Sequence, residues 1–130
     1  YQKAVERSQA VEGVVHLKSL GNAMDLYYLE NGHFPPYRSS LDVLGIGTNY
    51  ETNWWGGWSA GYMYLTNRKI GYRLAYIPKD QRSSEKGRIS CDTNNATSTR
   101  AADICKMLCG VSSLKKIWGS SIQEDGCIIK

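Results

Sequence analysis

The amino-acid sequence predicts an α+β domain in which one long N-terminal helix packs on a small antiparallel sheet and disulfides staple the C-terminal region. Three observations support this fold class. The first 31 residues contain no proline and repeat apolar residues at helical spacing, the pattern changes to strand-like alternation from residue 61, and all four cysteines follow residue 90. A length of 130 residues indicates a single domain over residues 1–130.

The opening helix is expected over residues 1–31. Its apolar stripe consists of Ala10, Val14, Leu17, Leu20, Met24, Tyr27 and Tyr28, which recur every three or four positions. Gly32 after Asn31 is a stop signal, and Pro35-Pro36 prevents the helix from resuming. No capping residue precedes Tyr1. We therefore expect the helix to continue from a segment that lies upstream of this sequence.

A helix-to-sheet loop is expected over residues 32–59. It contains a short helical turn from Ser39 or Ser40 to Gly45, followed by the irregular aromatic stretch "NYETNWWGGWSAG". The sheet and cysteine-rich region then occupies residues 60–130. The alternating segments "GYMYLT" and "GYRLAYIP", joined by "NRKI", predict an antiparallel hairpin.

The C-terminal part is expected to contain two more strands and a second helix. "RISCDT" predicts a short strand and "GCIIK" a last one. Between them, "STRAADICKMLCG" predicts a helix that is capped by Ser98 or Thr99 and ends at Gly110.

The four cysteines are Cys91, Cys105, Cys109 and Cys127, an even and clustered set that indicates disulfides in an oxidising compartment. Cys105 and Cys109 lie four residues apart on one helix face, near the limit for a mutual bond, so they should have different partners. Two pairings remain. We prefer Cys91 with Cys105 and Cys109 with Cys127, because each adjacent strand then reaches the nearer sulfur. A four-cysteine zinc site is the rival, but zinc ligands usually come in closer pairs.

The sequence offers little that suggests catalysis, so we expect no enzyme, no cofactor and no bound metal. His16 and His33 are too few to form a triad with a particular nucleophile, and no phosphate-binding loop or metalloprotease motif occurs. The net charge of +4, from 16 basic and 12 acidic residues, is typical of a solvated surface.

An unusual aromatic composition leaves a binding function open. Trp54, Trp55 and Trp58 could stack on a glycan or on single-stranded DNA, or they could simply cover the small sheet. Basic residues that could assist nucleic-acid binding are Arg68, Lys69, Arg73, Lys115 and Lys116.

The opening stretch "YQKAVERSQAVEGVVHLKSLGNAMDLYYLENGHFP", followed by "SSLDVLGI", resembles the type IV pilin family, which includes the pseudopilins of type II secretion. The matching positions are Tyr1-Gln2, Ala4, Arg7-Ser8, Ala10, Leu20, Ala23, Tyr27-Tyr28, Asn31-Gly32 and the proline just beyond. They span roughly the first 46 residues.

The resemblance implies a sequence of processing, membrane anchoring and filament assembly. Pilins are made with a short basic leader, which is cleaved before N-methylation, and an apolar N-terminal segment holds them in the inner membrane with the head in the periplasm. Those segments later form the core of a helical filament, and the heads, with a disulfide-closed C-terminal loop, face outward. The implied partners are copies of the chain, other pilins and the pilus assembly machinery, and the implied location is the bacterial cell surface.

The leading hypothesis is therefore a pilus subunit, major or minor, for adhesion, twitching motility or DNA uptake. Its subunit contacts should include Ala4, Val5, Val11 and Val15, because one sheet cannot cover the whole opening helix. A type II secretion pseudopilin is the alternative, although the resemblance implies calcium and no cysteines in the major form. A binding module that uses the tryptophans is the third hypothesis.

Overall fold

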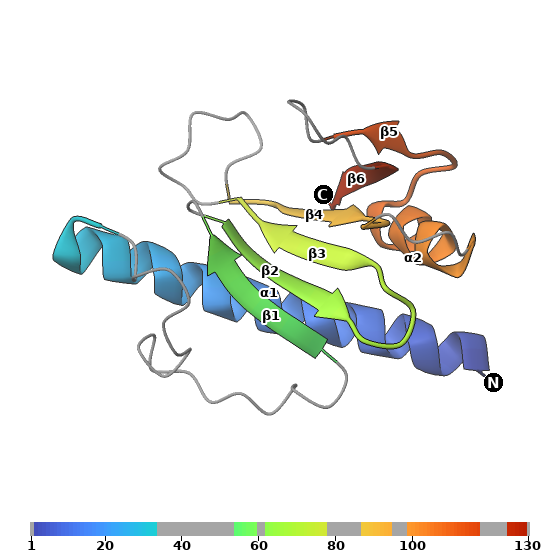
Figure 1. Ribbon diagram of the computed structural model, residues 1–130, viewed down its shortest axis with the longest axis horizontal. Coiled ribbons are helices and arrows are strands. Elements are labelled where there is room, and N and C mark those ends of the chain that lie inside the picture. The colour runs from blue at the N-terminus through green and yellow to red at the C-terminus, as the bar shows by residue number, and fades with distance from the viewer. Residues whose placement is uncertain are drawn as a thin grey trace.

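The computed structural model of the chain describes residues 2–33, 54–59, 62–77, 87–94, 99–117 and 125–129. The described elements are two helices and six strands, in the order α1 (Gln2–Asn31), β1 (Trp54–Ser59), β2 (Tyr62–Asn67), β3 (Arg73–Tyr76), β4 (Ile89–Asp92), α2 (Thr99–Cys109), β5 (Lys115–Lys116) and β6 (Asp125–Ile129). The strands form one antiparallel sheet in the order β1-β2-β3-β4-β6-β5, and α1 runs along it (Figure 1). This arrangement confirms the predicted α+β fold.

The inner face of α1 packs on the centre of the sheet, against β2, β3 and β4. Ala10, Leu17, Leu20 and Met24 are completely or almost completely buried. The other members of the predicted stripe, Val14, Tyr27 and Tyr28, are half-buried. The apolar periodicity of the sequence therefore identified the packed face of the helix.

A glycine sets how closely α1 approaches β3. A Cβ atom added to Gly21 would lie 2.5 Å from the ring of Tyr76, so the ring occupies the space that any larger residue would need. The Tyr76 hydroxyl donates a hydrogen bond of 2.6 Å to Asp25, one helical turn further along α1. Tyr76 thus fixes both the distance and the position of the helix on the sheet.

Both helices lie on the same face of the sheet. The register places Leu65, Leu74, Cys91 and Cys127 side by side across four strands, and all four are buried in the core beneath α1 and α2. The neighbouring row, which includes Arg73 and Asp92, therefore belongs to the opposite face.

Helix and turn signals in the sequence have clear structural counterparts. Gly32 and Gly110 have positive φ angles of 75° and 69° at the ends of α1 and α2. After α2, the amide of Val111 donates to the carbonyl of Lys106, which completes a Schellman-type ending. In the β2–β3 turn, the Asn67 side chain accepts hydrogen bonds from the amides of Lys69 and Ile70.

The structure differs from the expectation at two strands. Residues 54–59, expected at the end of the loop, form β1, whose six residues all pair with β2. The two-residue strand β5 was not expected at all. The expected helical turn at residues 39–45 lies outside the described residues, and the single-domain assignment remains a prediction.

Candidate functional site

The outer face of α1 carries an unusual number of apolar side chains. We define the exposed stripe as Ala4, Val11, Val15, Leu26 and Leu29, which share one side of the helix at 3.6 residues per turn. Val11 is 50% exposed, Val15 60% and Leu29 80%. Val5, at the flank of the stripe, is 39% exposed. Exposed Ser8 and Asn22 lie on the same side of the helix, so the stripe is mixed. Apolar side chains that recur at helical spacing on an exposed face indicate a second packing partner.

The four predicted contact residues, Ala4, Val5, Val11 and Val15, therefore all lie at the surface. The sequence analysis missed Leu26 and Leu29, which extend the stripe toward the C-terminal end of α1. Their spacing from Val15, 11 and 14 residues, repeats the helical period and could have identified them.

An ion pair between a buried glutamate and an exposed arginine joins the N-terminal turns of α1 to α2. Glu6 is only 6% exposed, and its carboxylate pairs with the guanidinium of Arg100 at the start of α2. A buried carboxylate is costly unless it is paired, so Arg100 allows Glu6 to lie inside the fold. The pair thus adds a polar contact between α2 and α1.

A cavity of about 570 Å³ lies beside this ion pair, between α1 and α2. It is lined by four basic and two acidic side chains together with one isoleucine, namely Lys3, Glu6, Arg7, Arg100, Asp103, Ile104 and Lys106. The lining thus has a surplus of two positive charges. Lys3, Arg7 and Asp103 are exposed and Lys106 is partly exposed, so the cavity opens to solvent.

The cysteines form two disulfides that tie α2 to the sheet. Cys91 of β4 bonds to Cys105, and Cys109 bonds to Cys127 of β6. These are the bonds of the preferred pairing. None of the four cysteines is free, so they cannot serve together as the ligands of a zinc site.

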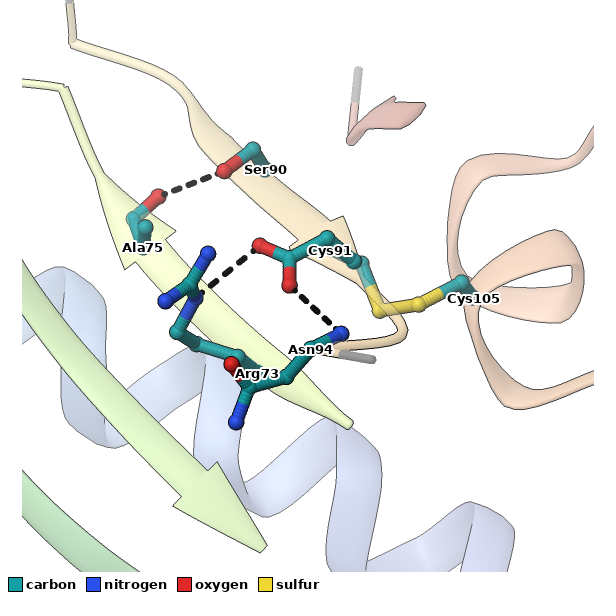
Figure 2. A network of polar contacts seen from close by, with 7 residues as sticks. Arg73, Ala75, Ser90, Cys91, Asn94 and Cys105 are labelled. Atoms are coloured by element: carbon teal, nitrogen blue, oxygen red, sulfur yellow. Dashed lines mark hydrogen bonds and ion pairs between the residues drawn. A yellow bond between two sulfur atoms is a disulfide. The ribbon is translucent and has the colours of Figure 1, made fainter. Parts of the chain in front are cut away.

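Arg73, one of the candidate nucleic-acid contacts, belongs to a polar network on the sheet face opposite α1 (Figure 2). Asp92 is completely buried and accepts hydrogen bonds from Arg73 Nε at 3.1 Å and from the amide of Asn94 at 2.9 Å. Cys91, which precedes Asp92 in β4, forms the disulfide to Cys105 close to this network. Arg73 therefore compensates a buried carboxylate.

The other basic candidates do not gather on one surface. Arg68 and Lys69 are exposed in the β2–β3 turn. Lys115 and Lys116 lie on β5, the edge strand furthest from β1, and Lys116 pairs with Asp125 at 2.7 Å. The backbones of Trp54, Trp55 and Trp58 are placed in β1, while their side chains lie outside what the structure describes.

Two buried tyrosines have perturbed acidities. Burial raises the pKa of the Tyr72 phenol well above its ordinary value. Burial also raises the pKa of Tyr76, and the hydrogen bond to Asp25 together with the negative charge of that residue raises it further. Both phenols are therefore structural groups that remain protonated at neutral pH. Within the described ranges, no three His, Cys, Asp or Glu side chains gather as a metal ion would require.

A long helix on an antiparallel sheet, with a disulfide-stapled C-terminal region, defines the class of pilin-like α+β domains. The family model for type II secretion system (T2SS), protein G, matches residues 1–106, and the chain belongs to this family. It is thus a pilin-like subunit of a secretion or pilus machine, with a periplasmic or surface-exposed location. Neither the curated proteins nor the solved structures contain a significant match. Of the described helices, none is both long and apolar enough to cross a membrane.

Proposed function

We propose that the chain is a structural subunit that polymerises into a helical filament through the outer face of α1, and that it has no catalytic activity. The observation that carries this proposal is the exposed stripe, which lies opposite the face that packs on the sheet. Repeating one heterologous contact by a screw operation produces an open filament, and it covers the same stripe in every copy.

The exposed stripe is small, which limits the free energy of association that its burial can supply. Burying a Val or Leu side chain contributes about 1.5 to 3 kcal/mol, and Val11, Val15, Leu26 and Leu29 still expose half or more of their area. Together they supply roughly 4 to 7 kcal/mol, which lies in the lower part of the estimated 4 to 15 kcal/mol cost of association. The head should therefore remain monomeric, and assembly needs the apolar N-terminal segment implied by the resemblance to pilins.

Of the two possible machines, we propose a type IV pilus at the cell surface, which would serve adhesion, twitching motility or DNA uptake. The two disulfides support this choice, because the resemblance implies a calcium site and no cysteines in the major secretion pseudopilin. A secretion pseudopilus is the second candidate, and the match to the protein G family model favours it.

The test uses the complete protein in its own cells. The double substitution V11E/V15E places charge in the stripe and should abolish filaments while leaving the level and the disulfides of the subunit unchanged. The matched control K69Q/K115Q also lowers the net charge by two, at exposed positions outside α1, and should assemble normally. Normal filaments from V11E/V15E would refute the proposal.

The same cells distinguish the two machines. For a pilus, filaments sheared from the cell surface contain the subunit, and deletion of its gene leaves protein export intact. For a pseudopilus, deletion stops the release of folded exoproteins, and surface filaments are absent at native expression. The second result would replace the pilus proposal with the pseudopilus one.

A further inference from the structure

The two ends of α1 carry opposite charges. At the N-terminal end, the cavity between α1 and α2 is lined by four basic and two acidic side chains. At the C-terminal end, Glu30 is exposed and the last turn contains no basic residue. These ends lie on opposite sides of the molecule, and α2 lies beside the N-terminal one (Figure 1). The positive and the negative charge are therefore separated along the length of the helix.

Three basic side chains of the cavity have no ion-pair partner among the described residues. Glu6 pairs with Arg100. No ion pair joins the other three, Lys3, Arg7 and Lys106, to a described side chain. Lys3 and Arg7 are four positions apart on one helix, where like charges destabilise the helix. Only one acidic side chain of the lining is left to oppose these three cations, so a further carboxylate in the cavity would relieve the repulsion.

Glu30 is the described acidic residue that has the complementary need. The other carboxylates outside the cavity each contact a histidine, tyrosine, arginine or lysine of the same chain, and they belong to Glu12, Asp25, Asp92 and Asp125. Glu30 has no ion pair or hydrogen bond from its side chain to another described residue. It also adds negative charge to a helix end whose carbonyl groups are already partly negative. A cation from outside the subunit would stabilise this end.

Glu30 cannot reach the cavity of its own subunit. Arg7 and Glu30 both belong to α1 and are 23 positions apart, which corresponds to about 35 Å along a helix. The cavity and Glu30 can therefore meet only between two copies of the chain, one displaced along the axis of α1. Because the two surfaces differ, this contact is heterologous, and its repetition produces an open polymer.

We propose that the cavity of one subunit receives Glu30 of the next subunit along the filament axis. Lys3, Arg7 and Lys106 pair with its carboxylate. Arg7 precedes Val11 of the exposed stripe by one helical turn, so this end-to-end contact is continuous on α1 with the lateral contact through the stripe. Complementary charges mainly fix the register of the subunits and exclude wrong neighbours. The inference rests on the filament function proposed above.

Charge reversal in the complete protein, in its own cells, tests this contact. Glu30→Lys and the double substitution K3E/K106E each bring like charges together, and each should lower the amount of filament by at least about tenfold. The triple variant K3E/K106E/E30K reverses both sides of the contact and should restore at least about half of the original amount. Misfolding cannot produce such a recovery.

The matched control reverses the same number of charges at exposed positions outside the cavity. K69E/K115E should assemble normally, and K69E/K115E/E30K should remain as deficient as E30K alone. All variants are compared at equal subunit level and with both disulfides formed.

Several outcomes would overturn the inference. Normal filaments from E30K or from K3E/K106E would show that the cavity and Glu30 do not meet. Two deficient variants that the triple variant does not restore would show that the two ends of α1 contact different groups. Equal recovery in K69E/K115E/E30K would mean that net charge alone governs assembly. In each case V11E/V15E still tests the filament proposal by itself, so the failure of this contact is distinguishable from the failure of that proposal.

Discussion

At the scale of single residues, the contact between Gly21 and Tyr76 determines how α1 sits on the sheet. The exposed fraction of Tyr76 is 1%, and its ring fills the space that a side chain at position 21 would need. In a solvated helix, glycine costs about 1 kcal/mol relative to alanine. Here the close packing outweighs that cost.

We therefore predict that Gly21→Ala destabilises the protein, by about 1 kcal/mol at the middle of the range that the two opposing contributions allow. Overpacking a core costs about 1 to 3 kcal/mol, while the gain in helix propensity returns about 1 kcal/mol or less. Urea denaturation of the oxidised protein measures the difference. Asn22→Ala, an exposed change one residue further along α1, should be neutral or stabilising. A Gly21→Ala protein more stable than the original would show that Tyr76 can move aside without cost.

Residues were predictable from the sequence where a local pattern identifies them. Ala10, Leu17 and Leu20 were placed in the core correctly because helical periodicity depends only on neighbouring positions. The burial of Glu6 was missed, because a glutamate in an exposed-looking turn is normally solvated. Its partner Arg100 is 94 positions away in the sequence, and only the packing of α2 on α1 brings the two together.

At the scale of elements, α2 is held to the sheet by covalent bonds as well as by packing. One disulfide attaches its middle to β4, and the other attaches its C-terminal end to β6. Strand β6 lies between β4 and the two-residue strand β5, so on its outer side only Asp125 and Gly126 have strand partners.

Removal of the Cys109–Cys127 disulfide should therefore loosen this edge first. The double substitution C109A/C127A is expected to lower the free energy of unfolding by about 2 to 4 kcal/mol. Hydrogen exchange should accelerate most in β6 and least in α1 and β2, because local openings occur where contacts are fewest. C91A/C105A is the matched comparison. If hydrogen exchange accelerates equally throughout the sheet and α1, the bond opposes global unfolding and does not oppose a local opening of this edge.

The strands illustrate why sequence patterns succeed for some elements and fail for others. β2 and β3 alternate clearly and are joined by a turn built on Asn67, so the hairpin was predictable. β1 contains Gly56 and Gly57, which disfavour a strand locally, and it forms because β2 offers an edge for pairing. β5 has two residues and no detectable period.

At the scale of the whole molecule, the core contains two phenols that resist ionisation, and this makes stability depend on alkaline pH. Tyr72 and Tyr76 are both almost completely buried, and the pKa of each is raised. In the unfolded chain a tyrosine titrates near pH 10. Below that pH both states bind the proton and stability is unaffected, whereas above it the unfolded state loses protons that the native state retains.

The contribution of these two tyrosines to the free energy of unfolding should therefore be constant below about pH 9. It should decrease as the pH rises past about 10. Each tyrosine contributes up to about 1.4 kcal/mol per pH unit, so the two together remove about 2 to 3 kcal/mol by pH 11. Urea denaturation at pH 8 and pH 11 measures this loss. The variant Y72F/Y76F is less stable at pH 8 but should lose correspondingly less between the two values. An unchanged loss in that variant would assign the alkaline effect to other groups.

The two disulfides have a mechanical consequence for a subunit under tension. They close sequence separations of 14 and 18 residues, and each extended residue would otherwise add about 3.3 to 3.6 Å to the chain. About 110 Å of contour length is thereby withheld from stretching. A pulling force that reaches β4 passes through Cys91 and Cys105, follows the last turn of α2, and leaves through Cys109 and Cys127. The C-terminal region can then be displaced under load, but the segments enclosed by the two disulfides cannot be extended.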